Sequence, residues 1–160
     1  MDDGRPKRNN HGQVPHNTDR VMRACSYHPA GSPPIDDTDF ALREADAGEL
    51  SVYAMSLTDP IDLKILVGPN VEYIGIVTVE QVLSQSLPGA MPHLGITFTT
   101  SYHPSDSTNI DNRKGAVGHC SIFGLNLPER IPGKSSFRQE RKDIRRQLAE
   151  AAIRNGTVKI

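Results

Sequence analysis

The sequence predicts a single α+β domain that is internally duplicated, with a pseudo-two-fold, a mainly antiparallel sheet and an amphipathic helix near the C-terminus. Three observations predict this fold class. Two twelve-residue stretches are alike, two further stretches downstream are alike in the same order, and segments of strand character alternate with segments of helical character. The length of 160 residues is that of one ordinary domain.

The duplication rests on two pairs of stretches. SYHPAGSPPIDD at 26–37 and SYHPSDSTNIDN at 101–112 share seven of twelve positions. GELSVYAMSLTDPI at 48–61 and GHCSIFGLNLPERI at 118–131 differ mostly by exchanges that keep the character of the side chain. The offset between copies is 75 residues for the first pair and 70 for the second, as expected when one loop is shorter. We therefore predict repeat halves at about 21–86 and 92–160, within one domain at 21–160.

The first twenty residues are predicted to form a disordered tail. Met1 and Val14 are their only clearly apolar side chains. A segment of this composition buries too little apolar surface to offset the conformational entropy lost on ordering.

Each half begins with an extended segment that leads into a His-Pro loop. Residues 21–27 and 94–102 contain β-branched and aromatic side chains, which favour strands. Proline keeps the histidine before it out of the helical region, so both segments end in turns. Residues 50–56 and 120–126 are predicted to be the strands that follow these loops.

The helix of the first half has clear boundaries in the sequence. Asp59 is a capping residue and Pro60 suits the first helical position, so a helix is predicted over 61–67. Gly68 ends it, and residues 73–79 are predicted to be the next strand.

The helix of the second half is longer. Ser136 and Gln139 form a capping-box pattern, and apolar side chains at helical spacing predict an amphipathic helix that stops near Gly156. A short strand over 157–160 completes the half, and residues 78–85 add a helical turn between the halves.

Composition disfavours several function classes. The net charge of −1 gives no general attraction to nucleic acid, and acidic residues dilute the basic stretch RQERKDIRR at 138–146. Further along the same predicted helix, Glu150 can pair with Arg154. No apolar run is long enough to cross a bilayer or to form a signal-peptide core, so a cytoplasmic location is expected. Cys25 and Cys120 are then expected to be reduced.

The paired histidines of the loops, His28 and His103, are the first candidate site residues. Imidazole titrates near neutrality and binds metals and ligands readily, which favours a functional site. The alternative is that a duplicated turn keeps its histidine for a purely structural role. With Ser51 and Arg23 they form a candidate ligand-binding set. A metal-binding version would add Asp36 or Asp111, but no close ligand spacing occurs, so neither a metal site nor a cofactor is predicted.

The second candidate is the strand that contains His119 and Ser121. Alternate strand residues share a face, so these two side chains point the same way. Glu49 and Ser51 occupy the corresponding positions of the first half. The four residues form either a shared cleft on the pseudo-two-fold axis or the solvated face of an antiparallel sheet. Cys120 points to the opposite side and is expected to be a buried core thiol.

HCSI at 119–122 resembles the H-x-[ST]-hydrophobic motif of the two-histidine phosphoesterases, which are small, internally duplicated α+β proteins. That family uses one such motif in each half, so that paired histidines act as acid and base on a phosphodiester. Here Glu49 stands where the second histidine belongs, and His93 in PHLGI lacks the hydroxyl residue. The resemblance implies a degenerate or altered site.

A second resemblance covers about residues 23–125. The order of Arg23, His-Pro, Phe40, LSVY and GHCSI is similar to that of a group of small uncharacterised bacterial proteins. This likeness implies a bacterial origin and a free-standing domain.

Two functions fit these features. The first is a small soluble binding or interaction protein whose protein partner or small ligand contacts the His-Pro loops and the polar strand face. The second is a hydrolase or phosphoesterase in which His119 and Ser121 act with Glu49 or His103 as the other acid/base group. The absence of a complete catalytic constellation in the sequence favours the first.

Overall fold

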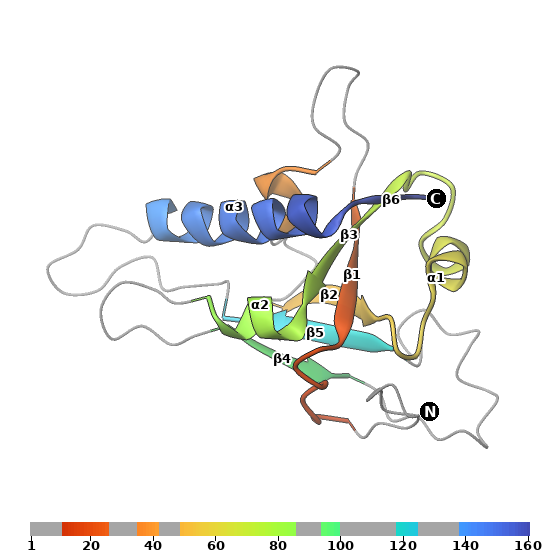
Figure 1. The fold of residues 1–160 in the computed structure, drawn as a ribbon, viewed down its shortest axis with the longest axis horizontal. Coiled ribbons are helices and arrows are strands. Elements are labelled where there is room, and N and C mark those ends of the chain that lie inside the picture. Colours follow the sequence, from red (N-terminus) through yellow and green to blue (C-terminus); the bar gives the residue numbers. More distant parts are fainter. Residues whose placement is uncertain (1–10, 26–34, 42–48, 86–93, 100–117, 125–137) are drawn as a thin grey trace, which may run out of the picture.

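The structure, a computed structural model, describes residues 11–25, 35–41, 49–85, 94–99, 118–124 and 138–160. In these residues six strands form one sheet in the order β4-β5-β2-β1-β3-β6, and every pairing is antiparallel (Figure 1). The strands are β1 (Arg20–Cys25), β2 (Glu49–Ala54), β3 (Tyr73–Thr78), β4 (Gly95–Phe98), β5 (His119–Phe123) and β6 (Val158–Lys159). The helices are the 3₁₀ helix η1 (Asp37–Phe40) and the α-helices α1 (Pro60–Val67), α2 (Val79–Leu83) and α3 (Arg138–Asn155). The α+β class with an antiparallel sheet is confirmed.

One face of the sheet packs against α3 and carries the larger core. The helix buries Ile144, Leu148 and Ala152 against strand residues such as Val21 and Val77. A Cβ built on Gly75 of β3 would lie 2.8 Å from Cδ1 of Ile35 and 3.5 Å from the Cβ of Ala152, so glycine at this position leaves room for the Ile35 side chain on the sheet. The amphipathic pattern near the C-terminus therefore predicted this helix and its buried face correctly.

The other face packs against α1 (Figure 1). Leu63 is fully buried in a second, smaller cluster with Met22, Tyr53, Ile74 and Ile76. The boundaries of α1 follow the sequence, because Asp59 accepts a hydrogen bond from the amide of Asp62 and Gly68 ends the helix at a φ of +90°. A left-handed backbone of this kind favours glycine.

Helix α2 begins directly where β3 ends. The Thr78 hydroxyl accepts a hydrogen bond from the Gln81 amide, and the Gln81 side chain accepts one from the Thr78 amide, which makes a capping box. The Asn155 side-chain amide donates to the carbonyl of Ile76 at 2.8 Å and to the Gln81 side chain at 2.7 Å. The last residue of α3 thus donates a hydrogen bond to a carbonyl of β3 that lies past the end of the two-residue strand β6.

Residues 11–19 belong to the fold, whereas the sequence assigned them to a disordered tail of twenty residues. The Gly12 amide donates to the carbonyl of Phe98 at 2.8 Å, and the Phe98 amide donates to the carbonyl of Gln13 at 2.9 Å. Asp19, immediately before β1, is only 4% exposed. Backbone pairing along β4 orders this segment without the apolar side chains that the composition argument requires.

The central strands are arranged symmetrically, but the rest of the fold is not. In the order β4-β5-β2-β1, the pair β2/β5 is flanked on each side by the strand that precedes it in the chain. The next strands break this pattern, because β3 pairs with β1 while β6 pairs with β3. Helices α1 and α3 lie on opposite faces of the sheet. None of the described helices is both long and apolar enough to span a bilayer.

Candidate functional site

The β2/β5 ladder brings the predicted strand residues together. Its register pairs Glu49 with Phe123, Ser51 with Ser121, and Tyr53 with His119. Residues directly opposite each other share a face, so these six side chains lie on the same side of the sheet. We call them the ladder face. The sequence correctly placed His119 with Ser121 and Glu49 with Ser51, and the register unites the two pairs.

Hydroxyl groups form a row across the middle of this face. Thr97 of β4 is the partner of Ser121, which is in turn the partner of Ser51. Ser121 is only 6% exposed, whereas Ser51 and Thr97 are half-buried. The more accessible hydroxyls are therefore those of Ser51 on β2 and Thr97 on β4, the two strands that flank β5. Ser121 is shielded between them.

His119 is already engaged by its neighbours. Its ring meets the Tyr53 ring edge to face, with centroids 5.1 Å apart, and its Nδ1 is hydrogen-bonded to the Thr99 hydroxyl. Burial lowers the pKa of His119 below its usual 6.5, and the Glu49 carboxylate opposes this shift as the lesser effect. The imidazole is thus a neutral group held in place by an aromatic ring and a hydroxyl.

Glu49 and His119 lie at opposite ends of the ladder. Glu49 is four residues from Tyr53, the partner of His119, so their Cα atoms are about 14 Å apart at a rise of about 3.4 Å per residue. An acid and a base that act in one reaction must each lie within hydrogen-bond reach of the atom that they serve. The two side chains share a face without a direct contact, and the Glu49 charge still acts on the His119 imidazole.

Phe123, which the sequence did not single out, is the exposed aromatic residue of the face. Its ring lies on Gly95 of β4, since a Cβ built on Gly95 would come within 2.2 Å of two ring carbons. The residue is nevertheless 41% exposed, and its cross-strand partner Glu49 is exposed as well. The match of Phe123 to Tyr53 in the duplicated stretches was the only signal in the sequence that drew attention to it.

Arg23 lies on the opposite face of the sheet from the ladder face. Met22 is the partner of Tyr53, and strand alternation places Arg23 on the other side. Its Nε donates to the carbonyl of Asp39 at 2.9 Å and one terminal nitrogen donates to the carbonyl of Ser51 at 3.0 Å. These bonds tie η1 and β2 to β1, which gives the guanidinium a structural task.

His28 and His103 lie outside the described residues, as does Asp111. Asp36 caps η1 and accepts a hydrogen bond from the Thr38 amide. Among the described residues, no group of three or more histidine, cysteine or acidic side chains is arranged to hold a metal ion.

Both thiols are buried and free. Cys25 and Cys120 are two strands apart in the sheet, about 10 Å for a spacing of about 4.8 Å, and disulfides require shorter Cα separations. Burial raises the pKa of Cys25 to about 12 and that of Cys120 further, so neither thiol is a ready nucleophile.

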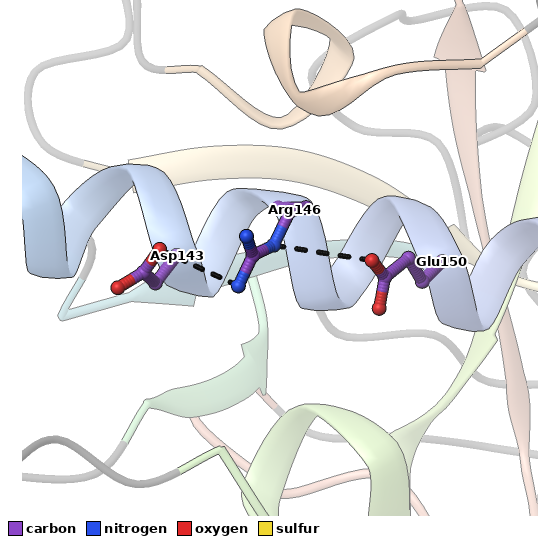
Figure 2. Close-up of polar contacts among 3 residues, drawn as sticks. All are labelled: Asp143, Arg146 and Glu150. Carbon is purple, nitrogen blue, oxygen red and sulfur yellow. Dashed lines mark ion pairs between the residues drawn. The ribbon is translucent and has the colours of Figure 1, made fainter.

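One arginine of the basic stretch, Arg146, is paired with acidic residues of the same helix. Figure 2 shows Arg146 between Asp143 and Glu150, with ion pairs of 3.5 and 3.9 Å. Glu150 was expected to pair with Arg154, and Arg146 is the partner seen here. All three side chains are well exposed, so the pairs add little stability and leave no concentrated positive field at this position.

No family model, curated protein or solved structure matches this chain.

Proposed function

We propose that this protein is a binding or interaction protein that contacts its partner through the ladder face and the two His-Pro loops. The observation that supports this most strongly is the direct cross-strand pairing of Ser51 and Ser121. It gathers polar side chains from both predicted halves on one face, where Phe123 is the exposed aromatic ring and Tyr53 is buried. Interfaces commonly combine an exposed aromatic anchor with polar groups of this kind.

The alternative, a hydrolase or phosphoesterase, has less support among the described residues. His119 is neutral and engaged with Thr99, and Ser121 is shielded from solvent. Glu49 and His119 are four residues apart along the ladder and are not in direct contact.

We also infer that the sequence arose by internal duplication. In support, the β2/β5 ladder is unchanged when each residue is exchanged for its copy 70 positions away: Glu49–Phe123 becomes His119–Tyr53, and Ser51–Ser121 maps onto itself. The relationship then weakens outward. Met22 pairs with Tyr53, so its copy Thr97 should pair with Phe123, yet Phe123 pairs with Gly95, a shift of two residues.

The binding function is tested by affinity capture from an extract of the native host, followed by titration with the purified captured protein. Ser51→Asn adds bulk at the centre of the ladder face and should weaken binding about tenfold, the loss typical of a well-packed interface position. Ser84→Asn, at the exposed end of α2, is the matched control.

The loops are tested by His28→Ala/His103→Ala, with His11→Ala/His16→Ala as the control that removes two exposed histidines. The loop variant should bind more weakly while its circular dichroism and unfolding midpoint stay unchanged. Equal binding by wild type, Ser51→Asn and the loop variant would reject the proposed function.

A further inference from the structure

The pair Glu49–Phe123 is the accessible end of the ladder face. The two residues are direct partners across β2 and β5, which places their Cβ atoms about 5 Å apart. Glu49 is exposed and Phe123 is 41% exposed. A carboxylate and an aromatic ring are therefore presented side by side to solvent.

The orientation of the ring is fixed from below. The ring lies directly on Gly95 of β4, where any side chain would overlap the ring carbons. The ring therefore rests on backbone with one side, and the residue is 41% exposed. Because the ring is already held on one side, less side-chain entropy is lost when a partner binds to it.

The carboxylate of Glu49 is available as well. In the part of the chain that the structure describes, ion pairs are found on α3 and not at Glu49. At the other end of the ladder, the corresponding place beside an aromatic ring is filled by the His119 imidazole, which contacts Tyr53. At the exposed end, the corresponding place beside the ring is held by Glu49.

We propose that Glu49 and Phe123 together bind an arginine side chain of a protein partner, an inference that rests on the binding function proposed above. A guanidinium group is planar, so it stacks on an aromatic face while its N–H groups donate to a neighbouring carboxylate. Lysine carries a compact, strongly hydrated charge that matches a flat ring less well.

The test is an NMR titration of the full chain with Nα-acetyl-arginine N-methylamide, observed at the Phe123 ring protons and the Gly95 amide. The citrulline derivative, which is neutral and of similar shape, and the lysine derivative are the matched probes. The arginine probe should shift both sets of signals in a saturable manner, the lysine probe less, and the citrulline probe hardly at all.

Two variants assign the effect to the pair. Glu49→Gln and Phe123→Leu should each weaken arginine binding about two- to fivefold, as expected for one exposed ion pair or one exposed cation–π contact. Glu72→Gln, another exposed carboxylate, should leave it unchanged. Equal responses to arginine and citrulline, or to arginine and lysine, would overturn the assignment, as would unaltered binding by Glu49→Gln.

The two proposals fail in different ways. If the protein does not respond to the arginine probe, and the captured partner binds wild type and Glu49→Gln equally, the arginine site is wrong. The binding function proposed above still holds in that case. An arginine response that needs Glu49 and Phe123 supports the site even where Ser51→Asn and the loop variant show that the wider surface is not used.

Discussion

The Tyr53 ring and the His119 imidazole meet edge to face, with their centroids 5.1 Å apart and their planes at 76°. They are cross-strand partners on β2 and β5, and the Thr99 hydroxyl is bonded to the Nδ1 of the same imidazole. This enclosure removes the imidazole from water, which penalises its charged form. The contact therefore links the packing of the ladder face to the protonation of His119.

Stability should fall as the pH decreases through the ordinary titration range of histidine. Burial depresses the pKa of His119 in the folded state below 6.5, so the unfolded chain takes up the proton first. The free energy of unfolding contributed by this group is fully present above about pH 6.5 and is lost as the pH falls toward the folded pKa.

Urea unfolding between about pH 7.5 and about pH 5 measures this effect, in a range above the main titration of carboxylates. His119→Asn should flatten the pH dependence, and His16→Asn, which changes an exposed histidine, should preserve it. An identical slope in wild type and His119→Asn would show that His119 does not titrate differently on folding.

The two thiols should be unreactive in the folded protein. Burial raises the pKa of Cys25 from 9.0 to about 12, which lowers its thiolate fraction about a thousandfold near pH 8. The pKa of Cys120 is raised as well, and these are the only cysteines in the chain. Ellman's reagent should therefore detect both thiols in urea and neither one rapidly in the native protein; fast labelling without denaturant would contradict this burial.

Because the Phe123 ring lies directly on Gly95, substitutions at these two positions should have strongly coupled effects on the free energy of unfolding. Gly95→Ala should force the ring away and cost about 1–3 kcal/mol, because the new Cβ occupies the position of the ring. In the Phe123→Ala background the same substitution should cost much less. A double-mutant cycle by urea unfolding should give a coupling of about 0.5–3 kcal/mol, and additive effects would refute the contact.

The sequence predicts local features of this fold well because their causes are local. Asp59, Pro60 and Gly68 bound α1 through capping and backbone conformation, and the apolar spacing of α3 shows its buried face. The same holds for the side-chain alternation that put His119 and Ser121 on one face.

The parts that were missed depend on contacts between distant segments. The position of Phe123 on Gly95 requires the register of β4 against β5, which no pattern within either strand determines. Residues 11–19 are held by backbone bonds to Phe98, Val79 and Glu80, which are remote in the chain. The Asp19 carboxylate also accepts a hydrogen bond from Ser56. The carbonyls of Asp39 and Ser51 are likewise remote from Arg23, so no local pattern shows these bonds.

Arg23 should contribute to stability rather than to binding. Its guanidinium donates to two backbone carbonyls on different elements, and a lysine ammonium does not reproduce this two-armed geometry. Arg23→Lys should therefore lower the free energy of unfolding by about 1–3 kcal/mol, since at least one partly buried carbonyl loses its donor. Arg20→Lys at the exposed start of β1 is the matched control and should change it by less than about 0.5 kcal/mol. Below the unfolding transition, Arg23→Lys should bind the captured partner as tightly as wild type. Unchanged stability combined with lost binding would instead make Arg23 a ligand residue.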